Sequence, residues 1–282
     1  MLNHIDTTES KTIGNTSAFL LAGLQEHGKL FFDTHDAMMV LSNRTPIAIR
    51  SLLSEMTKRG LLMRLKDGLY HIIPYDRAAA DYFPDWHLVA HHLAGKTPYY
   101  IGYYSALVLH DLTTQPSFQE QVVVAKPFRP NIRAVKGVPF QFIYHNPLHF
   151  FGIKKKWIDG VDQVNCSDLE KTFLDCLFQP DYAGGIVEIA KAIFKSKAII
   201  QENNLNTYLQ LFGSDAVIRR LGFLLELLEI LPNLSNNLLQ LIPHNTSYVV
   251  LDTGLPKEGK SNARWGIIQN MDLETIKTSV FS

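Results

Sequence analysis

The sequence predicts an α+β protein of two domains, a small N-terminal one and a larger mixed α/β domain with a helical C-terminal part. The chain has 282 residues, and at about 150 residues per domain this length fits two. Residues 1–75 contain three short helical patterns and then two apolar runs around an Asp-Gly turn. Later in the chain, apolar runs of strand length and of helix length are mixed.

Capping residues mark the three helices expected in the N-terminal domain. Ser17 is expected to cap the first helix, which ends at Gly28, and Asp33 or Thr34 the second, over 37–41. The third helix begins at Pro46, a residue suited to a first helical position, and extends to Arg59, where Gly60 ends it. Its inner face is predicted to consist of Ile49, Leu52, Leu53 and Met56.

A β-hairpin follows these helices. The apolar runs 61–65 and 69–73 flank Asp67-Gly68, a sequence typical of a hairpin turn. Three short helices followed by a hairpin predict a winged helix-turn-helix. In that fold the third helix enters the major groove of DNA and the hairpin follows the backbone.

Charge placement supports a DNA-binding function for this domain. Over the whole chain 27 basic residues balance 27 acidic ones, and a net charge of zero by itself argues against nucleic acid as a partner. Residues 44–66, however, contain six basic residues and only one acidic residue, Glu55, so this stretch has a net charge of +5. Lys and Arg neutralise phosphates in protein–DNA complexes. The predicted DNA-binding residues are Arg44, Thr45, Arg50, Ser51, Lys58, Arg59, Arg64 and Lys66.

Other classes of protein are disfavoured by composition. Hydrophobic residues make up 46% of the chain, which excludes a wholly disordered or collagen-like protein. The spacing of Cys166 and Cys176 fits neither a disulfide framework nor a metal site, so we expect two reduced, buried thiols. Residues 1–10 lack the features of a signal peptide, and no apolar run reaches the roughly 20 residues of a membrane span. We therefore expect a cytoplasmic protein, away from membranes, without metal or cofactor.

The second domain, residues 76–282, is expected to be mixed α/β to about residue 200 and mainly helical, with late strands, after it. Strands are predicted at 121–125 and 140–144, and a helix that Asp168 caps leads to Pro180. The basic run 154–156 is interpreted as an exposed turn, with a contact to DNA or a partner as the alternative. The remaining expectations are helices over 86–94, 186–194, 205–212 and 216–231, an apolar helix into which the run 99–107 leads and which ends near His110, a polar turn at 233–237, a loop at 254–259, and strands at 247–251 and 265–268.

Three groups of residues in this domain suggest other functions. His87 and His91 share a helix face and would suit zinc, but no third ligand is evident, so a histidine pair at a surface or interface is favoured. The aromatic cluster 99–104 fits a core or an interface better than the pocket of a ligand-sensing regulator. An enzyme, for example a nuclease, would need clustered carboxylates and lysine, for which Asp168, Glu170, Lys171 and Asp175 are the compact candidates, at poor spacing.

Several collinear segments resemble the AbiEi family of antitoxins, the antitoxin half of AbiE-type (type IV) toxin–antitoxin systems. The resemblance covers roughly residues 15–200. It rests on all of these segments occurring in the same order, since no single motif is decisive. The segments are 52–53, 56–62 (Met-Thr-Lys-Arg-Gly-Leu-Leu), 66–70 (Lys-Asp-Gly-Leu-Tyr), 99–107, 110–113 and 165–175, with Pro180 and Gly184-Gly185.

The resemblance implies a function in regulation and toxin control. Members of the family look like winged-helix repressors of their own operon, which they bind at inverted repeats in the promoter. They counteract a toxin of the nucleotidyltransferase type, and no catalysis is attributed to them. We therefore expect DNA and a toxin as partners, with the oligomeric state left open.

Overall fold

The computed structural model describes residues 11–113, 115–242 and 247–281, and these form two compact units. The first unit ends at Gly95 and the second begins at Lys96. The described residues contain eleven α-helices and three sheets, so the predicted α+β class is confirmed. No helix within these ranges combines the length and the apolarity needed to cross a membrane.

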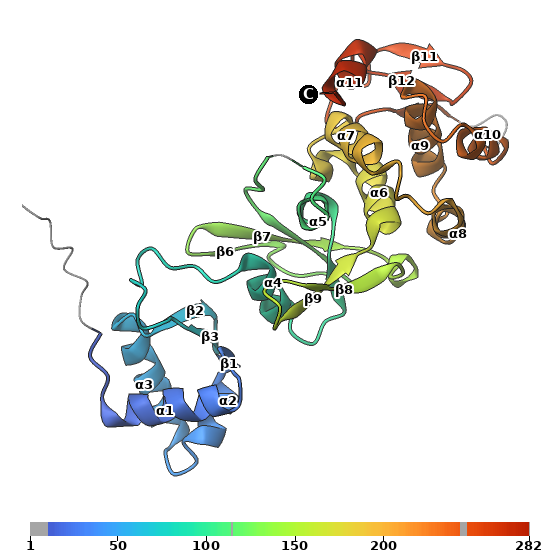
Figure 1. Cartoon of the computed structure of the whole chain (residues 1–282). Helices are drawn as coiled ribbons and strands as arrows, with labels where there is room; N and C mark the ends of the chain where they lie inside the picture. The colour runs from blue at the N-terminus through green and yellow to red at the C-terminus, as the bar shows by residue number, and fades with distance from the viewer. Residues whose placement is uncertain (1–10, 114, 243–246, 282) are drawn as a thin grey trace, which may run out of the picture. The chain divides into compact units, whose positions relative to one another are not determined.

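Three helices and a small sheet make up most of the first unit (Figure 1), and a fourth helix follows them in the chain. The sheet is antiparallel and has the order β1-β3-β2, so the strand between the first two helices pairs with the hairpin. The elements are α1 (Asn15–Glu26), β1 (Phe31–Asp33), α2 (Thr34–Val40), α3 (Pro46–Lys58), β2 (Leu62–Lys66), β3 (Leu69–Ile72) and α4 (Trp86–Ala94).

Side-chain caps explain where α2 and α3 begin. Asp33 caps α2 in a reciprocal box, since its carboxylate accepts from Asp36 N–H while the Asp36 carboxylate accepts from Asp33 N–H. The Thr45 hydroxyl accepts from Ala48 N–H at 3.3 Å, and Pro46 takes the first helical position, as predicted. The predicted Ser17 cap is wrong, because α1 begins at Asn15 and buries Ser17 within the helix.

The core of the first unit lies between the three helices and the sheet. Ile49, Leu53 and Met56 of α3 are buried there, and Leu52 is half-buried, which confirms the predicted inner face. Apolar residues at this spacing follow one side of a helix, so the opposite side of α3 is left to solvent.

The helix α4 belongs to the first unit because it packs beside the sheet. The His92 ring stacks on Phe31 with centroids 4.2 Å apart, and Lys66 Nζ donates to the Leu93 carbonyl at 2.9 Å. The compact unit therefore extends to Gly95, beyond the boundary after residue 75 that the sequence suggests.

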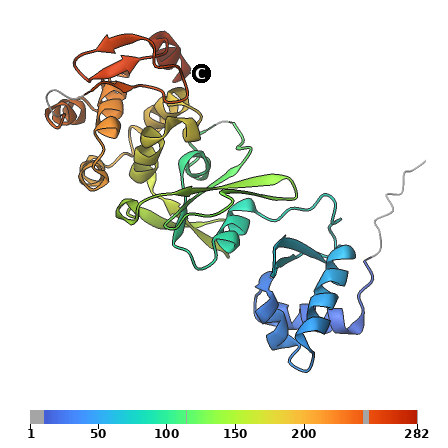
Figure 2. The same cartoon turned by 180° about the vertical axis from the view of Figure 1, so that it is seen from behind.

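A six-stranded mixed sheet organises the first half of the second unit (Figure 2). Its order is β6-β7-β5-β4-β9-β8, with β5–β7 and β4–β9 parallel and the other pairs antiparallel. The strands are β4 (Tyr99–Ile101), β5 (Glu120–Val124), β6 (Ile132–Val135), β7 (Val138–Tyr144), β8 (Ile153–Trp157) and β9 (Gln163–Ser167).

The predicted exposed turn at 154–156 is wrong. Lys154, Lys155 and Lys156 lie in β8, which pairs with β9 at the edge of the sheet. A strand with three consecutive lysines lacks the alternation of apolar residues by which strands are predicted. Lysine on an edge strand is nevertheless common, because it prevents unwanted pairing with other chains. The strands predicted near 121–125 and 140–144 are confirmed as β5 and β7.

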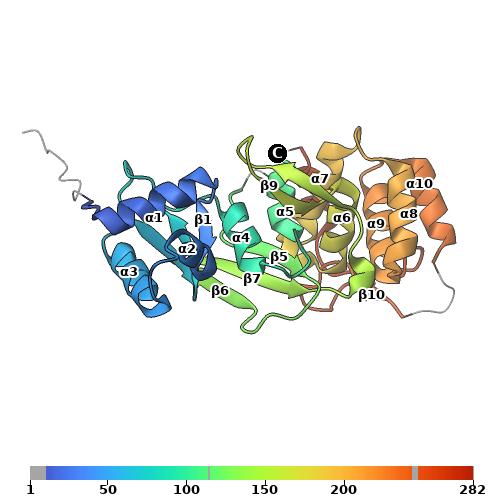
Figure 3. The ribbon, with the colours of Figure 1, turned by 90° about the horizontal axis from the view of Figure 1, so that it is seen from below.

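Helices pack side by side in the rest of the second unit (Figure 3). The predicted Asp168 cap of α6 is confirmed, since its carboxylate accepts from Lys171 N–H at 3.1 Å. The helices are α5 (Tyr103–Leu109), α6 (Leu169–Phe178), α7 (Ile186–Ser196), α8 (Glu202–Phe212), α9 (Asp215–Leu227), α10 (Pro232–Gln240) and α11 (Leu273–Ser279), with short 3₁₀ turns η1 (Pro147–His149) and η2 (Pro180–Ala183).

The predicted polar turn at 233–237 is wrong, because this segment lies in α10. Leu234 and Leu238, four residues apart, are both fully buried, and Pro232 starts the helix. A small sheet follows, of β10 (Val249–Val250), β11 (Lys260–Asn262) and β12 (Ile267–Gln269).

Trp265 joins this small sheet to α9. Its indole is fully buried, and its Nε1–H donates to Glu226 at 3.0 Å. A Cβ atom at Gly222 of α9 would lie 2.0 Å from the indole ring, so glycine is required at this contact.

Candidate functional site

The solvent-facing side of α3 gathers several of the predicted DNA-binding residues. Arg50, Ser51 and Lys58 are exposed on the side opposite the buried Ile49, Leu53 and Met56. Ile47, three residues before Arg50, is 78% exposed. Residues three, four or seven positions apart share a helix face, so this side presents cationic, hydroxyl and apolar groups together.

Three of the cationic side chains on or beside α3 are unengaged. Among the described residues, Arg44, Arg50 and Lys58 have no side-chain hydrogen bond or ion pair. Arg44 precedes the Thr45 cap and lines a groove of about 260 Å³ with Ser51 and Thr16 of α1. These cations are therefore available to phosphates, and we call Arg44, Arg50, Ser51 and Lys58 the α3 face.

The other four predicted residues have structural contacts. The Thr45 hydroxyl caps α3. Arg59 donates to the Thr12 carbonyl and to Ser17 Oγ, which ties the end of α3 to the start of α1. Lys66 donates to the Leu93 carbonyl, and Arg64 forms an ion pair with Asp67 in the hairpin. Half of the predicted set is thus occupied within the first unit.

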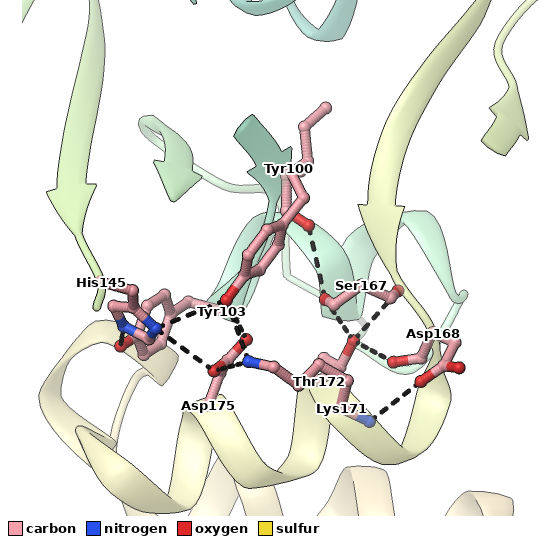
Figure 4. A network of polar contacts seen from close by, with 9 residues as sticks. Tyr100, Tyr103, His145, Ser167, Asp168, Lys171, Thr172 and Asp175 are labelled. Atoms are coloured by element: carbon pink, nitrogen blue, oxygen red, sulfur yellow. Dashed lines mark hydrogen bonds and ion pairs between the residues drawn. The ribbon is translucent and has the colours of Figure 1, made fainter. Parts of the chain in front are cut away.

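A buried polar network lies in the second unit, between the sheet and α6 (Figure 4). Lys171 and Asp175, four residues apart on α6, form an ion pair whose side chains are both 0% exposed. Lys171 Nζ donates to Tyr100 Oη at 2.9 Å, and the Tyr100 hydroxyl donates to Asp175 at 3.0 Å. His145 completes the network, since its Nε2 lies 2.6 Å from the Tyr103 hydroxyl and its Nδ1 lies 3.7 Å from Asp175.

Burial decides the protonation of these groups. Desolvation lowers the pKa of His145 to about 4, although Asp175 acts in the opposite direction, so this histidine is neutral at pH 7. Burial also raises the pKa values of Tyr100 and Tyr103 well above 10, so both phenols stay protonated. Desolvation lowers the pKa of Lys171, and the pairing with Asp175 opposes that shift.

Tyr103 holds a strained backbone within this network. Its φ is +53°, a left-handed conformation that costs a non-glycine residue free energy and persists only where the surroundings enforce it. The enforcing contacts are the bond to His145 and an edge-to-face contact with Tyr182 at 5.2 Å.

The four candidates for an enzyme do not meet at one accessible site. Asp168 caps α6 and accepts from the Tyr208 hydroxyl at 2.9 Å, while Glu170 accepts from Gln201 N–H at 2.8 Å. Lys171 and Asp175 do meet, but without exposed surface. Lys171 and Asp175 are four residues apart in a predicted helix, so their pairing could be predicted from the sequence. Tyr100 and His145 come from other elements, and no local pattern in the sequence predicts that they join the pair.

The remaining predicted groups are structural in the described chain. Tyr99, Tyr100 and Tyr103 of the aromatic cluster are buried in the core. Cys166 and Cys176 are free and buried, as predicted. His87 is buried on α4, and the described ranges contain no group of three or more His, Cys, Asp or Glu residues placed to hold a metal ion.

Comparison with known proteins gives a likeness in fold. No family profile matches the chain, and neither does any curated protein. Among solved structures, the chain is similar to the crystal structure of the RV2827C protein from Mycobacterium tuberculosis, with a TM-score of 0.74. The two are 15% identical, over 96% of this chain and 97% of that one. At this identity the likeness concerns the fold along nearly the whole chain.

Proposed function

We propose that the first unit is a winged helix-turn-helix and that the protein is a transcriptional repressor of its own toxin–antitoxin operon. The observation that carries the proposal is the α3 face, whose cations Arg44, Arg50 and Lys58 have no protein partner in the described chain. The helix–strand–helix–helix–hairpin order, with the β1-β3-β2 sheet, supports it. In winged helices the third helix of this order reads the major groove.

The chemistry of the α3 face suits DNA. Arginine forms bidentate bonds with guanine, and both arginine and lysine neutralise phosphates. Ser51 offers a hydroxyl to bases or phosphates, and the exposed Ile47 adds an apolar group of the kind that contacts thymine methyls. The ion pair with Asp67 lowers the net charge that Arg64 brings to the hairpin, so we assign the dominant contacts to α3.

The antitoxin part of the proposal rests on the resemblance to the AbiEi family. It assigns to the second unit the task of counteracting a nucleotidyltransferase-type toxin, without catalysis by this chain. A repressor of this kind acts in the cytoplasm, where Cys166 and Cys176 stay reduced. We expect a nucleotidyltransferase-like reading frame directly downstream of this gene. We also expect co-expression of this protein to relieve the toxicity of its product.

DNA binding is tested by charge reversal on α3. We expect the full chain to bind DNA from its own upstream region with an affinity that falls steeply with salt, and Arg50→Glu to weaken binding by at least about tenfold and to reduce the salt slope. Fluorescence anisotropy at several salt concentrations measures both quantities.

The matched control is Lys257→Glu, the same charge change at an exposed residue of the second unit. It is expected to leave affinity and salt slope unchanged. Equal losses for the two variants, or no salt-dependent binding by the unaltered chain, would refute the proposed interface.

A further inference from the structure

The second unit contains a cavity beside the end of β7 that is separate from the α3 face and shares only His145 with the buried network. Its volume is about 260 Å³. One wall comes from Phe128 and Asn131, which precede β6, and another from Gln179 and Tyr182, which follow α6. His145 of the buried network also lines it, so the network holds part of the cavity wall in place.

The cavity exists because β6 is too short to cover β7. The pairing of these strands runs only from Val135–Val138 to Ile132–Gln141. Beyond that point Phe142 N–H donates to the Asn131 carbonyl, and His145 N–H turns to the other side, to Val124. Successive residues of a strand point their backbone groups to opposite sides, so Tyr144 N–H and C=O point to the side that β6 leaves open.

The lining of the cavity is uncharged and rich in aromatic and amide groups. It includes no Asp, Glu, Lys or Arg, and His145 is neutral at pH 7 because burial lowers its pKa to about 4. Gln141 Oε1 accepts from Gln119 and Gln121, at 3.2 and 3.4 Å, which leaves its amide N–H groups without a partner in the described chain. The side-chain amide of Gln179 and the hydroxyl of Tyr182 likewise have no hydrogen bond there.

A cationic segment adjoins this neutral cavity. Residues 126–136 contain Lys126, Arg129, Arg133 and Lys136 and no acidic residue. Arg133 lies with its guanidinium 5.0 Å from the centroid of the Phe128 ring, and Phe128 is part of the cavity wall. A ligand with a neutral planar part and an anionic part would therefore meet complementary groups in both places.

We propose that this cavity binds a mononucleotide, with the base inside and the phosphate against residues 126–136. Bases stack on aromatic rings and pair their edges with Asn and Gln amides. The volume lies below the roughly 300–1,000 Å³ of sites for drug-sized ligands, which fits a single base better than a larger molecule. A free amino acid is disfavoured, because its two charges would enter a cavity without countercharges.

The inference is tested by titrating the full chain with AMP, GMP, CMP and UMP, the corresponding nucleosides and inorganic phosphate in a calorimeter. We expect at least one mononucleotide to bind with a Kd below about 1 mM, its nucleoside to bind more weakly, and phosphate alone not to compete. No binding of any mononucleotide at millimolar concentration would overturn the proposal, as would binding of phosphate alone with the same affinity.

Variants distinguish the cavity from other surfaces. Gln179→Leu and Tyr182→Phe are each expected to weaken the binding of both the mononucleotide and the nucleoside by about tenfold, which corresponds to the loss of one well-placed hydrogen bond. Arg129→Gln is expected to weaken the mononucleotide alone. The control Gln210→Leu, at an exposed position of α8, should have no effect.

Thermal denaturation shows that each variant is folded before it is titrated. Unchanged affinity in both cavity variants, Gln179→Leu and Tyr182→Phe, would overturn the assignment to this cavity. The α3 face lies in the other unit. The mononucleotide titrations and the DNA-binding assay of Arg50→Glu therefore test the two proposals independently.

Discussion

At the scale of single residues, the ion pair of Lys171 and Asp175 belongs to the buried network of the second unit. Both side chains are fully buried, and Tyr100 contacts each of them. Removing two charges from water is costly, and their mutual attraction roughly compensates for it. Such a pair therefore adds little net stability, but it leaves a large penalty when one partner is lost.

Replacement of Lys171 tests this balance. Lys171→Met leaves Asp175 buried without its counterion, and we expect the free energy of unfolding to fall by about 3–5 kcal/mol. The double variant Lys171→Met/Asp175→Leu should recover much of that loss. Urea denaturation of both variants measures the difference, and a double variant as unstable as the single one would show that the charges themselves stabilise the fold.

His145 makes the stability of the second unit depend on pH. The unfolded chain binds a proton at this histidine below its ordinary pKa of 6.5, whereas in the folded chain the pKa is about 4. The unfolded state therefore binds more protons between these values, and stability falls as the pH falls from 6.5 toward 4. The contribution of this one group to the slope is up to about 1.4 kcal/mol per pH unit.

The measurement is the unfolding free energy at several pH values, followed through the buried Trp265 after Trp86→Phe and Trp157→Phe. His145→Gln is expected to reduce the number of protons taken up on unfolding between pH 4 and 6.5 by about one, and with it the slope of the unfolding free energy against pH. His27→Gln, at the exposed residue that follows α1 in the first unit, should leave the slope of the second unit unchanged, and an equal slope with and without His145 would contradict the expectation.

At the scale of elements, α3 and β8 show two uses of cationic residues. On α3, the cations have no partner within the described chain and face solvent. On β8, Lys154 lies 3.4 Å from Asp168, and the run of lysines occupies the edge of the sheet. Cationic side chains therefore stay available to an external partner on α3, whereas on β8 they cover the edge of the sheet, a common device against pairing with other chains.

Two substitutions distinguish the capping role of Thr45 from its predicted contact with DNA. Thr45→Ala removes the acceptor for Ala48 N–H, and we expect a loss of about 1 kcal/mol in the stability of the first unit. Thr45→Ser keeps the acceptor and should keep the stability. Chemical denaturation measures the effect, and an Ala variant with full stability but weaker DNA binding would identify Thr45 as a DNA contact instead.

At the scale of the whole molecule, the cationic residues of the first unit are concentrated in one segment. The net charge of zero is the sum of a basic 44–66 segment and a remainder of the opposite sign. A neutral protein therefore presents a cationic surface on one unit. Overall charge describes solubility and association, whereas its distribution decides which partner each unit suits.

The two units are expected to fold separately. A fragment of residues 11–95 should unfold cooperatively and keep the salt-dependent DNA binding that is proposed for the full chain. A fragment of residues 11–75 lacks α4, with its stacking on Phe31 and its bond to Lys66, and should melt at a lower temperature. Circular dichroism on heating compares them, and equal melting temperatures would place the boundary at residue 75.

Local patterns predicted much of the fold and little of the network. The Asp33 and Asp168 caps, and the strands β5 and β7, follow from side chains that act on neighbouring backbone or alternate along it. The lysines of β8 gave the wrong expectation of a turn, because an edge strand tolerates polar residues that periodicity assigns to loops. The helix α10 was missed because its polar residues outnumber the buried Leu234 and Leu238.

The α+β class, the starts of α2, α3 and α6 and the basic character of 44–66 can be read from the sequence alone, since each depends on residues close together in the chain. Which cations remain available depends on the tertiary structure, because the partners of Arg59 and Lys66 come from α1 and α4. The tertiary structure also brought Tyr100 and His145 to α6 and left β7 uncovered beside the cavity. Contacts between distant segments depend on how elements pack, and local periodicity contains no information about that packing.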